Sequence, residues 1–172
     1  MTSVNIGLLL LRVGFAGLLL GHSTQKLFGW FRGAGPSGSG ALFETWGFRP
    51  GPPLAVAAGA LELVGLSSIA LGLLTPGGCA VLIGTMIVAA SPNAHNGLWA
   101  HLGGNELPVV YAFLAAVLAF TGPGRYSLDN ALGLHPGLGW SVAAVVVGVA
   151  AAVPMLLRRR AALRSQPKEV TP

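Results

Sequence analysis

The sequence predicts an all-α membrane protein, with a four-helix transmembrane core followed by a fifth, C-terminal transmembrane helix. Of its 172 residues, 53% are apolar and only 9% are charged, whereas about 25% of the residues of a typical soluble domain are charged. Several apolar runs reach or approach the roughly 20 residues that a helix needs to cross a bilayer. These runs cover residues 5–24, 54–74, 78–90, 107–121 and 138–157.

The first run is expected to remain in the mature protein. No basic segment precedes it, and it is followed by polar and aromatic residues, GHSTQKLFGWF at 21–31, in place of a small-residue cleavage site. Tryptophan and phenylalanine side chains suit the boundary between lipid and water. We therefore interpret 21–31 as the exit of the first span.

The third and fourth runs are shorter than a full span, so each is expected to tilt, to be extended by its flanks or to be partly re-entrant. A tight reversal is expected at Thr75-Pro-Gly-Gly, before the third run. Residues 32–40, RGAGPSGSG, predict a flexible loop. Residues 127–132 predict a short amphipathic turn on the surface.

The basic residues indicate the orientation. Eight of the ten Lys and Arg residues follow either the first run or the fifth, which places the C-terminus in the cytoplasm of a multi-pass cell-membrane protein. We prefer this interpretation to a nucleic-acid-binding arm. The expected parts are a bundle at 1–132, an additional helix at 133–157 and a disordered basic cytoplasmic tail at 158–172.

Cysteine usage limits the redox chemistry that the chain can carry alone. Cys79 is the single cysteine, which leaves no intrachain disulfide, no CxxC pair and no thiolate metal cage. The sequence also has no haem-attachment motif and no dinucleotide fingerprint in context. No haem, metal or nucleotide is therefore expected, and electrons would have to come from a partner or from the substrate.

Two charged residues, Arg12 and Glu62, lie inside apolar runs. Each costs at least about 2.5 kcal/mol in hydrocarbon, so each is expected to face the bundle and to seek a partner. They have opposite signs and lie on consecutive antiparallel spans. An axial mismatch of about 7 to 8 Å at about 1.5 Å per residue is within reach of a guanidinium stem. We therefore expect the two to pair.

The first run also has a polar face, because Arg12, His22 and Lys26 fall within an arc of about 80° on a helix. The topology brings Glu106, which opens the fourth run, to the same end of the bundle. A pocket that opens to the cytoplasm is predicted from Arg12, His22, Gln25, Lys26, Glu62 and Glu106. In it, Glu62 and Glu106 would handle protons, and the other four would bind a quinone or a small anion, because cationic donors stabilise the charge that develops on reduction.

A structural alternative stays open at this point. Arg12 and Glu62 would then only lock two helices together, and His22 and Lys26 would anchor the span at the interface.

Several motifs together resemble the DoxX family of bacterial membrane proteins, over about residues 6–132. The motifs are Arg12, His22-x-x-Gln25-Lys26-Leu27-Phe28-Gly29, FETWGF at 43–48, Glu62, Gly72-Leu-Leu-Thr75, Glu106-Leu-Pro108 and Gly122-Pro-Gly-Arg-Tyr-Ser-Leu-Asp129. The chain departs from the family at Ser23, where glycine is frequent, and at Pro76. The fifth run and its arginines extend past the family's usual four-helix core.

The resemblance implies a four-helix core related to the small membrane subunit of thiosulfate:quinone oxidoreductase, and an association with redox or sulfur-stress complexes. A small-molecule or lipid carrier is weakly favoured by the polar residues at mid-membrane but is opposed by the lack of recognisable repeats. Two other hypotheses are weighed. The chain is a redox-linked subunit that binds quinone or a small anion, or it is a noncatalytic scaffold that recruits a soluble enzyme to the cytoplasmic face. Both involve the lipid bilayer and neither involves nucleic acid. The sequence leaves homo-oligomerisation and the reaction itself open.

Overall fold

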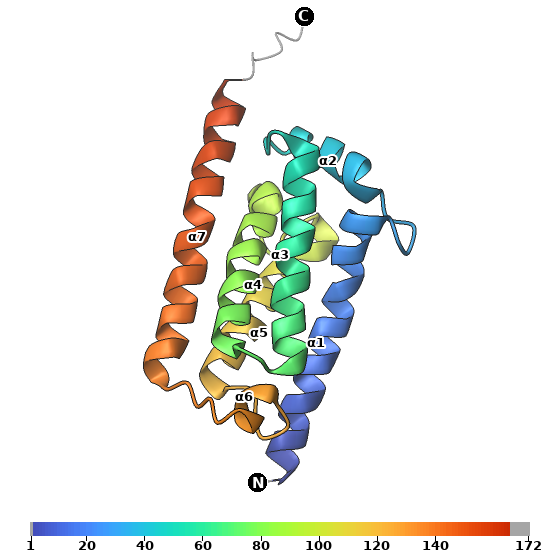
Figure 1. Ribbon diagram of the computed structural model, residues 1–172. Helices are drawn as coiled ribbons and strands as arrows, with labels where there is room; N and C mark the ends of the chain where they lie inside the picture. Colours follow the sequence, from blue (N-terminus) through green and yellow to red (C-terminus); the bar gives the residue numbers. More distant parts are fainter. Residues whose placement is uncertain (1, 166–172) are drawn as a thin grey trace, which may run out of the picture.

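Five long helices run alternately in opposite directions and form one bundle, as the apolar runs predict (Figure 1). The computed structural model describes residues 2–165. The five helices are α1 (Thr2–Phe28), α3 (Gly51–Leu71), α4 (Thr75–Ala90), α5 (Glu106–Thr121) and α7 (Leu138–Arg164). Among the described residues, four helices are long and apolar enough to cross a membrane, and α5 is a shorter apolar helix. The all-α membrane fold is therefore confirmed.

The two ends of the bundle differ. The N-terminus, the turn between α3 and α4, and the short helix α6 (Leu128–Ala131) lie at one end, which we call the α6 end (Figure 1). Helix α2 (Gly35–Thr45) and the last turns of α7 lie at the other, which we call the α2 end. The described termini therefore lie at opposite ends of the bundle.

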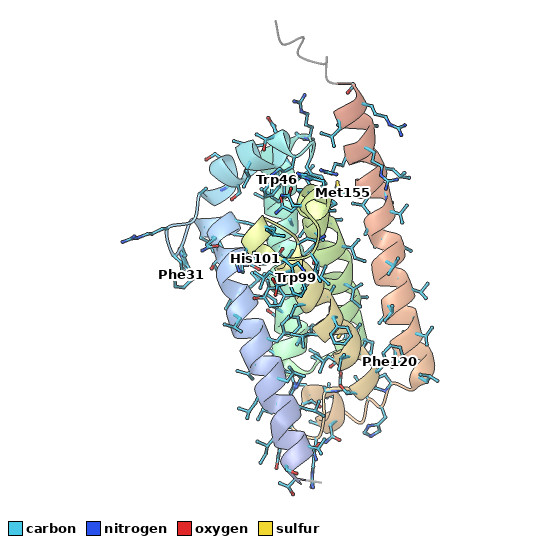
Figure 2. All side chains as sticks on the ribbon, turned by 180° about the vertical axis from the view of Figure 1, so that it is seen from behind. Phe31, Trp46, Trp99, His101, Phe120 and Met155 are labelled. Carbon is cyan, nitrogen blue, oxygen red and sulfur yellow. The ribbon has the colours of Figure 1, made fainter. Side chains whose placement is uncertain are left out.

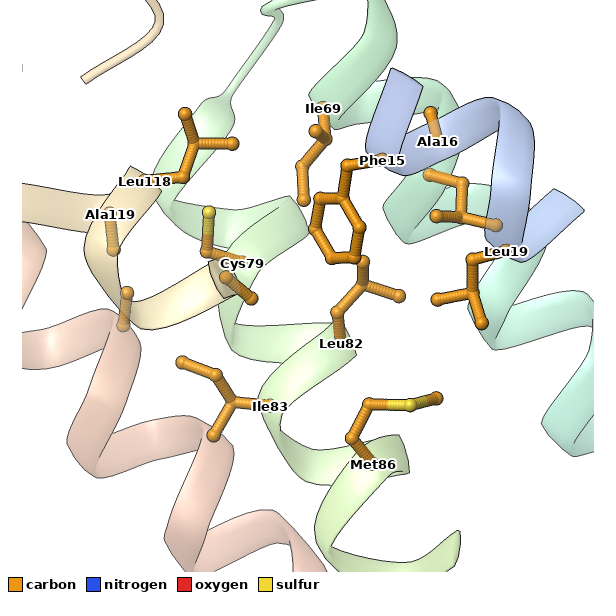
Figure 3. Close-up of a cluster of buried hydrophobic side chains, with 13 residues drawn as sticks. Phe15, Ala16, Leu19, Ile69, Cys79, Leu82, Ile83, Met86, Leu118 and Ala119 are labelled. Atoms are coloured by element: carbon orange, nitrogen blue, oxygen red, sulfur yellow. The ribbon is translucent and has the colours of Figure 1, made fainter. Parts of the chain in front are cut away.

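Helix α4 is central: it packs against α3, α5 and α7, while α1 packs mainly against α3. The buried core between these helices is made of aliphatic side chains, Phe15 and the single cysteine (Figure 3). Its largest fully buried apolar members are Leu66, Ile69, Leu82 and Leu118. Helix α7 approaches α4 closely at Gly148, where a Cβ atom would lie 2.9 Å from the Cβ of Ile83.

The prediction of a flexible loop at 32–40 is wrong, because α2 begins at Gly35. Pro36 occupies the first turn, where its missing N–H costs nothing. Gly40 then lets the helix lie directly on α3, since a Cβ there would be 2.5 Å from the backbone of Pro52. Contact between small residues thus outweighs the low helix propensity of the Gly/Ser-rich segment.

Helix α7 continues through Arg164, beyond the predicted end at 157. The first part of the predicted disordered tail is therefore helical, and Lys168 lies outside the described residues. The short turn predicted after Ser127 is confirmed as α6, with the Ser127 hydroxyl accepting a bond from the N–H of Asn130. Two 3₁₀ turns, Ser91–Asn96 and Ala100–Leu102, connect α4 to α5.

Candidate functional site

A partly buried ion pair joins α1 to α3. The Lys26 Nζ atom lies 2.6 Å from Oε1 and 2.5 Å from Oε2 of Glu62. The Ser23 hydroxyl donates a further bond of 3.1 Å to Oε2. Glu62 is 2% exposed, whereas the Lys26 side chain is 22% exposed. We call Ser23, Lys26 and Glu62 the charged cluster.

Close helix packing makes the charged cluster possible. Gly59 lies one turn before Glu62, and a Cβ atom at Gly59 would be 2.8 Å from Cγ of Leu27 and 3.4 Å from Cβ of Lys26. The absence of that side chain lets α1 approach α3 until the ammonium group reaches the carboxylate. An unpaired carboxylate at this depth would be costly, and the bonds from Lys26 and Ser23 offset that cost.

The predicted pairing of Arg12 with Glu62 is wrong. The fully buried guanidinium of Arg12 donates to the carbonyl oxygens of Ile69 at 3.4 Å and Ala70 at 3.3 Å, and also to that of Tyr126. The first two carbonyls belong to the last turn of α3, which carries the negative end of the helix dipole. The carbonyl of Ile69 also accepts a bond of 3.1 Å from the N–H of Gly72. Arg12 is thus bound by backbone atoms at the α6 end.

Asp129 completes this arrangement. Its carboxylate accepts bonds from the N–H of Leu74 at 2.7 Å, the N–H of Thr75 at 3.0 Å and the hydroxyl of Thr75 at 2.7 Å. Its own N–H donates to the carbonyl of Gly72 at 2.7 Å. An anion therefore lies at the positive N-terminus of α4, close to the cation at the negative C-terminus of α3. We call Arg12, Gly72, Thr75, Tyr126 and Asp129 the polar junction.

The remaining predicted site residues lie apart from both groups. His22 is exposed, and Gln25 is half-buried against Gly33. Glu106 accepts a bond of 2.9 Å from the N–H of Ala100 and so holds the turn that precedes α5. The structure brings together Lys26 and Glu62 of the six predicted residues, while Arg12 joins the polar junction. Within residues 2–165, no three His, Cys, Asp or Glu side chains are placed to hold a metal ion.

Sequence reasoning missed Ser23, Thr75 and Asp129 as site residues. Asp129 follows the α6 cap in Ser127-Leu-Asp129, and Thr75 opens a helix whose preceding residue, Leu74, has no capping side chain. A helix start without its own cap indicates that a side chain from elsewhere supplies the acceptor. That signal predicts that another segment supplies an acceptor for the start of α4, but it does not identify Asp129 as the residue that does so.

Comparison with protein-family models identifies the family of the chain. The family model described as DoxX matches residues 7–102, which is more than half of the chain. The matched range includes the whole charged cluster and Arg12, whereas Glu106 and Asp129 lie beyond it. No curated protein and no solved structure matches the chain.

Proposed function

This chain belongs to the DoxX family of membrane proteins, and from that premise we propose that it is the membrane-embedded subunit of a redox-linked complex whose charged cluster binds a quinone or a small anion. The observation that carries the proposal is the Lys26/Glu62 pair inside the bundle, in which the Lys26 side chain remains 22% exposed. Ionisable pairs inside transmembrane segments are expensive and commonly mark substrate or proton pathways.

The donor set of the charged cluster fits such a ligand. An ammonium group has three N–H donors, and Glu62 is the one acceptor that contacts Lys26 among residues 2–165. A remaining N–H of the Lys26 ammonium can therefore donate to a ligand that approaches its exposed side. A bound quinone would supply a redox-active head whose oxygens become more negative on reduction, and Lys26 would orient and stabilise that oxygen.

Glu62 has a different part in this proposal. Its carboxylate holds the Lys26 ammonium in one direction, and the Ser23 hydroxyl holds the carboxylate in turn. Since the chain has one cysteine and no electron-carrier motif, a soluble oxidoreductase would supply the electrons. The positive-inside rule places that partner at the α2 end, on the cytoplasmic side.

Quinone extraction tests the proposal. The full-length protein is purified from its membrane in mild detergent, and retained quinone is measured by mass spectrometry for wild type, Lys26→Met and Glu62→Gln. The matched control is His22→Gln, which changes an exposed residue one turn before Lys26. Loss of quinone in the first two variants and retention in the control supports the proposal. Equal retention in all folded variants overturns it.

A second candidate function, a noncatalytic scaffold, is favoured by one specific observation. The buried charges Arg12 and Glu62 have partners within the chain, so their role in holding helices together needs no ligand. The scaffold would present α2 and the arginines of α7 to a soluble enzyme. Recovery of such an enzyme with the wild-type protein, without quinone and unaffected by Lys26→Met, favours the scaffold.

A further inference from the structure

We propose that the α2 end of the bundle holds one anionic phospholipid, with an acyl chain in an apolar groove between α3, α4 and α7 and the phosphate on Arg159. The cavity that forms the groove has a volume of about 260 Å³. Its walls come from three helices and its cover from two phenylalanines. The lining includes Ala58 and Leu61 of α3, Gly84 and Thr85 of α4, Met155 of α7, and Phe43 and Phe48.

The chemistry of the walls selects a hydrocarbon chain. Thr85 is the one polar side chain among the lining residues. Its hydroxyl bonds to carbonyls of its own helix, Val81 at 3.0 Å and Leu82 at 3.1 Å. The groove therefore offers no free donor to the carbonyl of a quinone head. Its volume lies just below the roughly 300–1,000 Å³ of small-molecule sites, which suits part of one chain.

Arg159 lies at the edge of the groove. It follows the lining residue Met155 by one turn on the same face of α7, and its guanidinium carbon is 5.6 Å from the centre of the Phe48 ring. Its Nε atom donates to the carbonyl of Trp46 at 2.8 Å. Figure 2 shows Trp46 and Met155 at this same end of the bundle. The guanidinium is thus fixed beside the aromatic cover.

The charge of Arg159 has no ion-pair partner among residues 2–165. The Lys26/Glu62 pair is the single ion pair among the described residues, so no carboxylate there neutralises Arg159. Its neighbours Arg158 and Arg160 are exposed. The fixed guanidinium of Arg159 above a hydrocarbon groove complements a phosphate that carries an acyl chain. This site lies on the α7 side of α3, whereas the charged cluster lies between α3 and α1.

Lipid titration of the delipidated full-length protein, followed by native mass spectrometry, tests the proposal. The probes are phosphatidylglycerol and phosphatidylcholine. Wild type is expected to prefer phosphatidylglycerol, and Arg159→Gln to bind it about fivefold more weakly, as follows from the loss of one cation near a phosphate. The matched control is Arg158→Gln, which removes the same charge from the exposed neighbour and is expected to bind nearly as wild type.

Three further variants separate the groove from the charge. Ala58→Phe fills the groove and is expected to abolish the tightly bound lipid, whereas Ala143→Phe, on an exposed face of α7, is not. Arg159→Lys is expected to keep the preference for the anionic lipid. Equal losses in Arg158→Gln and Arg159→Gln would overturn the proposal. So would unchanged binding in folded Ala58→Phe, or occupation of the groove by a quinone or a second copy of the chain.

Discussion

The guanidinium of Arg12 lies against the α-carbon of Gly72, so that any side chain at position 72 would collide with it. Gly72 also has a φ of +62°, in the left-handed region, and ends α3 by donating its N–H to Ile69. One glycine thus meets two demands of the polar junction: the reversal of the chain and the room for a buried cation.

Gly72→Ala is therefore expected to destabilise the protein by at least about 2 kcal/mol, because a left-handed non-glycine residue is itself strained and Arg12 must also move. Thermal unfolding in detergent measures the effect. The control is Gly77→Ala, since Gly77 is exposed and a Cβ there meets no atom within 4 Å. A similar loss of stability in both variants would contradict this account of the polar junction.

Asp129→Asn is expected to lower stability by about 3 kcal/mol, because the amide cannot accept all three bonds that reach the carboxylate and loses the charge at the start of α4. Asn130→Ala changes the exposed neighbouring side chain and is expected to have little effect. Denaturant titration of both variants makes the comparison. An Asp129→Asn protein as stable as wild type would rule out the capping role.

A double-mutant cycle distinguishes the observed charge pair from the one first predicted. Lys26→Met and Glu62→Gln are each expected to cost about 3 kcal/mol, and the double variant much less than their sum, because each single change leaves a buried group without its partner. The parallel cycle of Arg12→Met with Glu62→Gln is expected to be additive within about 0.5 kcal/mol, because these residues share no partner. Coupling in the second cycle and none in the first would reverse the assignment.

Gly148→Leu is expected to destabilise the protein by about 1 to 3 kcal/mol, because a Cβ at Gly148 already lies 2.7 Å from the carbonyl oxygen of Ala80, in α4. Helix α7 would have to move away from α4. Gly139→Leu, in the first turn of α7, places its side chain in open space and serves as the control. Unfolding temperatures of the two variants give the test, and a tolerated Gly148→Leu would show that this contact is unimportant.

The long helices could be predicted because a membrane helix must satisfy all its backbone bonds internally, and 20-residue apolar runs have few other solutions. The same rule did not identify α2. Its Gly/Ser-rich sequence has low helix propensity, and the contact that compensates for it, Gly40 on Pro52, depends on the fold. The predicted end of α7 at residue 157 is too early for a related reason. Leu163 and Arg159 pack against Gly47, and this contact also depends on the fold.

The sequence correctly predicts that Arg12 and Glu62 are buried and have partners, but it does not identify those partners. Their opposite charges predict that Arg12 pairs with Glu62. Arg12 is instead bound by backbone carbonyls, which no sequence pattern displays. Lys26 was assigned to a pocket or an interfacial anchor, without a specific partner. Its contact with Glu62 depends on the close approach of α1 to α3 at Gly59, which is a property of packing.

The position of the Arg12 contacts along the chain has a consequence for biogenesis. Two of its acceptors are in the last turn of α3, and the third, Tyr126, is separated from Arg12 by more than a hundred residues. While the ribosome is still making the segments that follow α3, the guanidinium lacks the third of these acceptors. The complete set of Arg12 contacts can therefore form only after residue 126 has been synthesised.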